Sequence, residues 1–259
     1  RIGEERFRRE HECEFLIFDE TLISSITLAD MEGNAPVETT GQVRWFKKPT
    51  PGMTYMVSLD PAMGTGGDFA AIQVFELPTF EQVGEWHHNT TPMNQQIRIL
   101  QGINKHIYDT IMEQDASASP QIFYSMENNT IGEAALLRVM DIGEENIQGM
   151  FLSEPIRKGH RRKFRRGFNT TAKFKIDACT KFKELIEGGK MKINSQLLIS
   201  ELKDFVASGL SFKAKPGQHD DLVSACLLMT RMMKVLADFD PKIFEKWTDR
   251  TSELTPMPI

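Results

Sequence analysis

Three short runs with the composition of β-strands follow one another in the first half of the chain, and a helical pattern comes directly after them. The runs cover residues 55–59, 70–77 and 82–88, and turn-forming residues separate them. Consecutive strands with short connections favour an antiparallel meander. Across residues 93–112 the apolar side chains recur at helical spacing. This order predicts one sheet with a long amphipathic helix packed against it.

The rest of the chain continues as alternating strand and helix patterns. We expect strands at 122–126 and 191–193, and helices at 131–140, 171–186, 197–206 and 220–236. This order predicts an α/β fold in which a mixed β-sheet is flanked by helices on both faces. Residues 52–240 would form this domain. Residues 1–51 are interpreted as a linker with the tail of a preceding domain, and residues 241–259 as a C-terminal tail.

The composition allows a large buried core in a reducing compartment. The chain has 259 residues, of which 40% are hydrophobic, so it needs no disulfide or metal to fold. Its three cysteines, Cys13, Cys179 and Cys226, are widely spaced and odd in number, which argues against a disulfide framework and a zinc ligand set. No apolar run is long enough to cross a bilayer. We expect a soluble protein without a membrane partner and, since Arg1 comes first, a fragment of a longer chain.

Positive charge is concentrated in one stretch of a chain whose net charge is −5. Residues 157–166 include seven basic side chains, namely Arg157, Lys158, Arg161, Arg162, Lys163, Arg165 and Arg166. Such a run neutralises phosphates without reading bases. We therefore predict that it binds the DNA backbone, and a solvated face or a targeting tract is the alternative interpretation.

Three carboxylate positions stand where a sheet can bring distant parts of the chain together. Asp60 ends the first of the three strands, Glu127 follows the strand at 122–126, and the pair Asp220-Asp221 opens the last helix. Each carboxylate alone is more often a solvated loop residue or a helix cap. Hard oxygen ligands gathered at one sheet edge, however, suit Mg²⁺ or Mn²⁺. The combined pattern predicts a metal site.

Helical register distinguishes the two adjacent aspartates. Asp221 shares its row with the apolar residues Ala225, Leu228 and Met232, whereas Asp220 shares a row with Ser224, Leu227 and Arg231. We expect Asp221 to face the interior as a metal ligand, and Asp220 to cap the helix or to support the site indirectly. Because the helix is apolar over most of its surface, the choice between the two stays open.

Two other motifs resemble parts of nucleotide-binding sites. The apolar run at 15–18, followed by Asp19-Glu20, invites a Walker B interpretation, but the chain contains no G-x-x-x-x-G-K-[ST] phosphate loop. The glycine-rich turn at 64–67 could resemble the phosphate loop of actin-like ATPases, but a second phosphate loop is not found. We interpret it as a turn between strands that also brings Asp68 near the metal site.

Three sequence blocks together resemble the nuclease motifs of the large terminase subunits of tailed, myovirus-type bacteriophages. They are L-D-x-x-x-G-x-G-x-D at 59–68, M-E-N-N-T at 126–130 and H-D-D-L-V at 219–223. The resemblance covers residues 54–235 and implies an RNase H-like fold of the RuvC and integrase superfamily. It also implies a preceding ATPase motor domain, so ATPase activity is expected only in the full-length protein.

The resemblance further implies an endonuclease that cuts concatemeric viral DNA during genome packaging by two-metal hydrolysis with Mg²⁺ or Mn²⁺. By motif position, Asp60, Glu127 and Asp221 would be catalytic metal ligands, with Asp220 as a further candidate ligand. The accessory residues would be Asp68, Asp220, His219 and Asn128. Implied partners are double-stranded DNA, the ATPase domain, the small terminase subunit and the portal protein, at the procapsid vertex in the host cytoplasm. A Holliday-junction resolvase or transposase of the same superfamily and a silent DNA-binding or assembly module remain alternatives.

Overall fold

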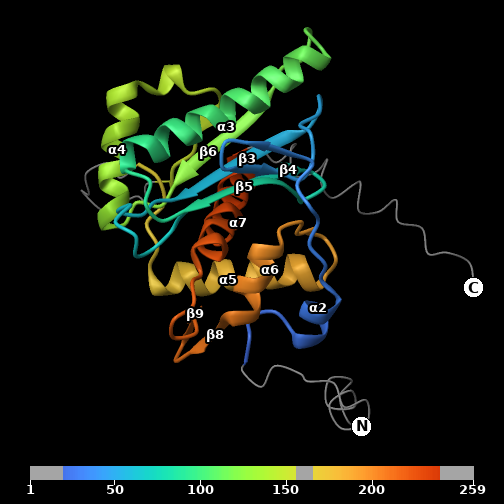
Figure 1. The fold of residues 1–259 in the computed structure, drawn as a ribbon, viewed down its shortest axis with the longest axis vertical. Helices are drawn as coiled ribbons and strands as arrows, with labels where there is room; N and C mark the ends of the chain where they lie inside the picture. Colours follow the sequence, from blue (N-terminus) through green and yellow to red (C-terminus); the bar gives the residue numbers. More distant parts are fainter. Residues whose placement is uncertain (1–19, 156–165, 240–259) are drawn as a thin grey trace, which may run out of the picture.

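A seven-stranded mixed sheet forms the centre of the computed structural model, which describes residues 20–155 and 166–239 (Figure 1). The strand order is β1-β2-β5-β4-β3-β6-β7. The strands are β1 (Glu38–Thr40), β2 (Val43–Trp45), β3 (Thr54–Asp60), β4 (Ala70–Leu77), β5 (Glu81–His88), β6 (Gln121–Met126) and β7 (Met150–Phe151). Neighbours from β1 to β3 are antiparallel, whereas β6 runs parallel to β3 and to β7. The predicted mixed sheet and its antiparallel meander are therefore confirmed.

Helices cover both faces of this sheet, as predicted (Figure 1). They are α2 (Ser25–Asp30), α3 (Met93–Gln114), α4 (Thr130–Ile142), a 3₁₀ turn (Glu144–Asn146), α5 (Ala172–Glu187), α6 (Gln196–Asp204) and α7 (Asp221–Phe239). Helices α3 and α4 lie on one face, and α7 crosses the other face with α5 and α6 beneath it. Within the described residues, no helix is both long and apolar enough to span a membrane.

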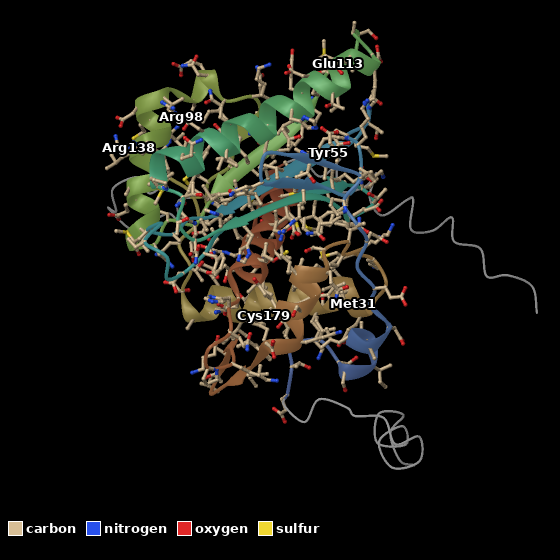
Figure 2. The ribbon with its side chains drawn as sticks, viewed as in Figure 1. Met31, Tyr55, Arg98, Glu113, Arg138 and Cys179 are labelled. Carbon is tan, nitrogen blue, oxygen red and sulfur yellow. The ribbon has the colours of Figure 1, made fainter. Side chains whose placement is uncertain are left out.

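Strand β3 contributes side chains to two separate hydrophobic cores because successive residues of a strand point to opposite faces. Tyr55, Val57 and Leu59 belong to the core under α3 and α4, whereas Met56 belongs to the core around α7. Figure 2 shows Tyr55 at the sheet and Cys179 of α5 in the other layer. One core therefore fixes α7 to the sheet, and the other fixes α3 and α4 to its opposite face.

A hydrogen bond between a strand and a helix reinforces this packing. The buried Ser58 Oγ atom of β3 donates to the Ala225 carbonyl oxygen of α7 at 2.7 Å. The bond joins residues two positions before Asp60 and four positions after Asp221. It therefore ties the end of β3 to the first turns of α7.

Two predicted elements differ from the observed ones. Residues 191–193 form no strand, and only an isolated bridge pairs Lys192 with Glu81. The helix predicted to reach residue 206 ends at Asp204, because the chain turns into a hairpin of β8 (Phe205–Ser208) and β9 (Ser211–Ala214). Gly209 in the connecting turn has φ 61°, a conformation that favours glycine. Phe205 at the start of the hairpin is fully buried. A helix continued to residue 206 would not require this burial.

The described part of the predicted linker packs against the rest of the fold. Strand β2 pairs with β5, and Trp45 in β2 is buried. Leu22 and Ile23 belong to the core around α7. The division of the chain at residues 51 and 240 stays a prediction, but residues from 20 onward already contribute to the packed domain.

Candidate functional site

The parallel pair β3 and β6 brings Asp60 and Glu127 to the same sheet edge. Leu59 is the register partner of Met126, so the next residues of both strands emerge side by side. The Glu127 N–H donates to the Leu59 carbonyl oxygen at 3.1 Å, which extends the ladder by one residue. The juxtaposition thus follows from backbone pairing, although 67 positions separate the two residues.

Helix α7 brings a third carboxylate to this edge. Asp221 is the first residue of α7, and its side chain is only 16% exposed. The Oδ2 atom is buried without a hydrogen-bond partner among the described residues, and it lies 3.6 Å from His219 Nδ1. Burying a carboxylate oxygen without a hydrogen bond is unfavourable in free energy, and a bound cation would offset this cost.

The carboxyl groups influence one another strongly. Burial raises the pKa of Asp60 well above its usual value, and the charge and hydrogen bonding of Glu127 and the charges of Asp221 and Asp220 raise it further. Burial, followed by the charge of Asp220, raises the pKa of Asp221 to about 6, against the opposing effect of His219. These groups therefore share one electrostatic environment, in which added positive charge is stabilising.

The donor chemistry fits a divalent, oxygen-seeking cation in an open site. Asp60, Glu127 and Asp221 offer only carboxylate oxygens, which are the ligands of Mg²⁺ and Mn²⁺. Across residues 20–155 and 166–239, no group of three or more His, Cys, Asp or Glu side chains is arranged so that it could hold a metal ion without further ligands. Mg²⁺ typically keeps several waters and binds through one or two carboxylates together with substrate phosphate oxygens. The incomplete cluster is consistent with that mode of binding.

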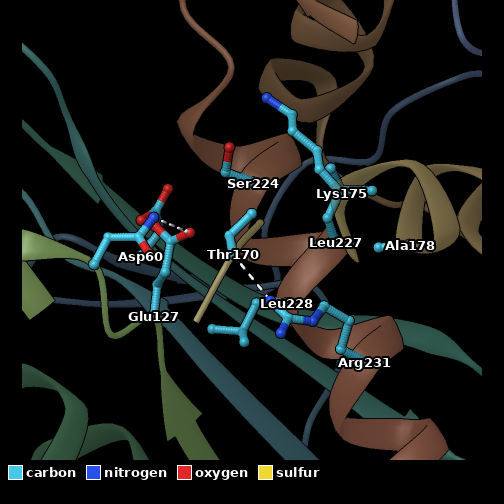
Figure 3. Close-up of a pocket in the computed structure, with 10 residues that line it drawn as sticks. Asp60, Glu127, Thr170, Lys175, Ala178, Ser224, Leu227, Leu228 and Arg231 are labelled. Carbon is cyan, nitrogen blue, oxygen red and sulfur yellow. Dashed lines mark hydrogen bonds between the residues drawn. The ribbon is translucent and has the colours of Figure 1, made fainter. Parts of the chain in front are cut away.

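A pocket of about 260 Å³ opens beside Asp60 and Glu127 (Figure 3). Its other lining residues are Asn129, Thr170, Lys175, Ala178, Ser224, Leu227, Leu228 and Arg231. The Asn129 side-chain amide donates to Glu127 Oε1 at 2.9 Å. One wall of the pocket is thus acidic, and α5 and α7 form the opposite wall.

The predicted accessory residues occupy different positions around this pocket. Asp68 is exposed in the glycine-rich turn, and its charge contributes to the raised pKa of Asp221. Asp220 Oδ2 accepts a hydrogen bond from the Ala214 N–H at 3.3 Å. The structure brings Asn129 into the pocket, rather than the predicted Asn128. Asn128 is buried, and its side-chain amide donates to the Arg166 carbonyl oxygen at 2.6 Å.

Most of the predicted DNA-binding run lies outside the described residues. This applies to Arg157, Lys158, Arg161, Arg162, Lys163 and Arg165. The remaining member, Arg166, forms an ion pair with Glu144, and its guanidinium lies 5.7 Å from the ring centroid of Phe151. Arg166 already has protein partners, which reduces its availability for phosphates.

Arg231 joins the two chain segments that flank residues 156–165. Its guanidinium forms an ion pair with Glu154 and donates to the Asn169 carbonyl oxygen and to Thr170 Oγ1, each at 3.0 Å. It also lies 5.2 Å from the ring centroid of Phe168. Sequence patterns did not identify Arg231, because its partners come from two other parts of the chain.

Glu201 is a further residue that the sequence patterns did not identify. Its Oε2 atom accepts a hydrogen bond from the Val223 N–H in the first turn of α7 at 3.1 Å, and its Oε1 atom lies 3.7 Å from His87 Nε2. Burial raises the pKa of Glu201 to about 9, and burial lowers the pKa of His87 to about 4. Near neutral pH both groups are uncharged, so their proximity is not an ion pair, and 3.7 Å is too long for a hydrogen bond.

The mixed sheet with helices on both faces is an RNase H-like α/β fold, and Asp60 and Glu127 lie together at the ends of two of its strands. The family model described as "Terminase RNaseH-like domain" matches residues 57–232. The chain therefore belongs to the terminase nuclease-domain family, in agreement with the resemblance of its sequence blocks.

Solved structures with the same fold include terminase nuclease domains from phages and from a herpesvirus. The magnesium-bound large terminase nuclease of thermophilic phage G20c has a TM-score of 0.60 at 15% identity, covering 83% of this chain and 97% of that chain. The nuclease domain of the Thermus phage P74-26 large terminase has a TM-score of 0.55 at 16% identity, covering 78% and 91%. The manganese-soaked, inhibitor-bound nuclease domain of human cytomegalovirus terminase has a TM-score of 0.52 at 15% identity, covering 82% and 94%. At these identities the matches show the fold.

Proposed function

We propose that this domain is a metal-dependent endonuclease that cuts concatemeric viral DNA during genome packaging. The observation that carries the proposal is the pairing of Asp60 with Glu127 at the ends of adjacent parallel strands. Membership of the terminase family supplies the packaging context. The raised pKa of Asp60, caused by burial and by the neighbouring carboxylates, supports a requirement for cations at this site.

Asp60, Glu127 and Asp221 would hold Mg²⁺ or Mn²⁺, with Asp220 close enough to influence the same site. Structures of similar nucleases carry bound magnesium, bound cobalt or soaked manganese, which supports a divalent ion here. Bound ions of this kind activate a water molecule and stabilise the departing 3′ oxygen of a phosphodiester. We propose the two-metal form of this chemistry.

The protein groups around the ligands would orient them. Asn129 donates a hydrogen bond to one oxygen of Glu127, which would fix the orientation of that carboxylate. Burial lowers the pKa of His87 to about 4, so its imidazole is a weak base near neutral pH and we assign it no role as a general base. Asp68, Asp220 and His219 would tune the charge around Asp221.

The charge of the basic run from Arg157 to Arg166 supports a role in holding DNA phosphates. The remaining assignments follow from the family. The ATPase domain, the small terminase subunit and the portal protein would be partners of the complete protein at the procapsid vertex in the host cytoplasm.

The decisive experiment incubates the purified chain with supercoiled plasmid in Mg²⁺, in Mn²⁺ and in EDTA. We expect nicked and linear DNA only with the divalent ions, and loss of cleavage in Asp60→Asn with an unchanged circular dichroism spectrum. Loss of a direct ligand should exceed the roughly 100-fold loss typical of residues that support ligands. DNA binding without cleavage in any metal would instead indicate a silent binding module, and selective cutting of four-way junctions would indicate a resolvase.

A further inference from the structure

Two cationic side chains line the pocket opposite Asp60 and Glu127, and their surroundings differ. Arg231 is committed to Glu154, Asn169 and Thr170, and its side chain is only 10% exposed. Lys175 comes from α5 and is 26% exposed. Figure 3 shows both side chains together with the acidic pair. Lys175 is therefore more available than Arg231 to bind a ligand.

The ammonium of Lys175 is held only loosely by the described residues. Its nearest carboxylate oxygen is Asp220 Oδ2 at 3.8 Å, which is longer than a hydrogen bond. Its Nζ atom also lies over the ring of Phe205, 5.4 Å from the ring centroid, which is a cation–π contact. An ammonium has three donors, so a half-buried Lys175 can still bind an anion.

We infer that Lys175 binds a backbone phosphate of DNA adjacent to the phosphate that is cleaved. This inference rests on the proposed nuclease function, because it assumes that the scissile phosphate lies at Asp60 and Glu127. One strand of DNA carries a charge about every 3.4 Å along the helix axis. Neighbouring phosphates are farther apart in space than this axial rise, because the strand winds around the axis. Lys175 lines the same pocket of about 260 Å³ as Asp60 and Glu127, so a strand with its scissile phosphate at the acidic pair can present the next phosphate to Lys175.

This assignment gives Lys175 a positioning role that is independent of base sequence. A point charge attracts any phosphate and reads no base edge, as a nuclease of low sequence preference requires. The two walls of the pocket would then bind different parts of one strand. The acidic wall takes cations and the scissile group, and the α5 wall takes the neighbouring phosphate.

The test compares Lys175→Met with Lys173→Met. Methionine keeps an unbranched apolar side chain of similar length and removes the charge, and Lys173 is an exposed lysine on the same helix that does not line the pocket. Binding of a fluorescent duplex is measured by anisotropy over a series of salt concentrations with Ca²⁺, after checking that the duplex stays intact. We expect Lys175→Met to lower the slope of log K against log salt by about 0.9, the value for one phosphate contact. We expect Lys173→Met to change the slope less, and Lys175→Arg to restore it.

Cleavage and metal binding provide the second readout. With Mg²⁺, Lys175→Met should raise KM for DNA more than it lowers kcat, and Mn²⁺ affinity should stay at the wild-type value. An unchanged salt slope combined with altered Mn²⁺ affinity would overturn the inference, because Lys175 would then only neutralise the negative charge of Asp220. Equal slope changes in Lys173→Met and Lys175→Met would also overturn it. If the wild-type chain cuts no DNA in any metal, the proposed function fails instead, and the two failures are distinguishable.

Discussion

The Glu201 side chain of α6 accepts a hydrogen bond from the Val223 N–H of α7, two residues beyond Asp221, at 3.1 Å. The first N–H groups of a helix lack partners within that helix, so a carboxyl group from another helix here acts as a cap supplied from outside. The contact fixes the first turn of α7 relative to α6. Glu201 thus affects the position of Asp221 without lying in the pocket.

We predict that Glu201→Gln preserves the site and that Glu201→Ala damages it. Burial raises the pKa of Glu201 to about 9, so the residue is neutral at pH 7 and glutamine retains both its shape and its acceptor. Alanine removes the cap, which should cost about 0.5–2 kcal/mol of unfolding free energy and weaken Mn²⁺ binding. Urea unfolding and Mn²⁺ titration check both effects.

A matched control for Glu201 is available on α5. Glu184 is an exposed glutamate that pairs with Lys181 at 3.2 Å on the surface, so Glu184→Ala should change the unfolding free energy by less than about 1 kcal/mol. If Glu201→Gln weakens Mn²⁺ binding as much as Glu201→Ala, the charge of Glu201 is important and the capping explanation is wrong.

The second prediction concerns the paired aspartates. Asp221→Asn should impair cleavage far more than Asp220→Asn, because Asp221 has a buried carboxylate oxygen without a hydrogen-bond partner among the described residues whereas Asp220 accepts from the Ala214 N–H. An asparagine at position 220 can keep that hydrogen bond. Initial rates on plasmid DNA with saturating Mg²⁺ measure the difference, and Asp177→Asn on the exposed face of α5 is the control. Equal losses at positions 220 and 221 would show that both carboxylates bind metal.

The third prediction is that metal affinity increases with pH around pH 6. Burial and the charge of Asp220 raise the pKa of Asp221 to about 6, so below this pH the group is mostly a neutral acid. A metal ligand must be deprotonated, and at pH 5 only about a tenth of this group is ionised. Calorimetric Mn²⁺ titrations from pH 5 to 8 should therefore show weaker binding at the acid end. Asp221→Asn should flatten this dependence.

The same pKa shift predicts the pH dependence of stability without metal. Between about pH 4 and pH 6 the folded protein retains a proton on Asp221 that the unfolded chain releases. The free energy of unfolding should therefore decrease as pH rises through this window. Thermal melts in EDTA should show this trend, and added Mn²⁺ should oppose it above pH 6. A melting temperature that rises across the window even in Asp221→Asn would assign the dependence to other groups.

The fourth prediction concerns the basic run. Replacing Arg161, Arg162, Arg165 and Arg166 with alanine should weaken binding to every DNA sequence alike and reduce the salt dependence by about 0.9 for each phosphate that the variant no longer binds. Arg166→Ala alone should have a smaller effect on the slope, because Arg166 is paired with Glu144. Electrophoretic mobility shifts at several salt concentrations measure both variants, and Arg98→Ala on the exposed face of α3 is the control. Unchanged binding in the fourfold variant would identify the run as a surface that does not contact DNA.

Local patterns in the sequence determined the element order and the candidate carboxylates. Strand periodicity and helical spacing depend on neighbouring residues only, so the meander, α3 and the start of α7 lie within about two residues of their predicted positions. The positions of Asp60 and Glu127 at strand ends could be predicted from the sequence for the same reason. The hairpin after Asp204 was not, because burial of Phe205 against distant residues overrides the local helical pattern.

Only the tertiary structure decided which side chains share the pocket. Parallel pairing of β3 with β6 sets Asp60 beside Glu127, and packing of α5 against α7 brings Lys175 to the pocket. Glu201 resembles an ordinary surface carboxylate of an amphipathic helix in the sequence, and its role depends on a contact with a residue 22 positions away. Such contacts join residues that are far apart in the sequence, so no local sequence pattern indicates them.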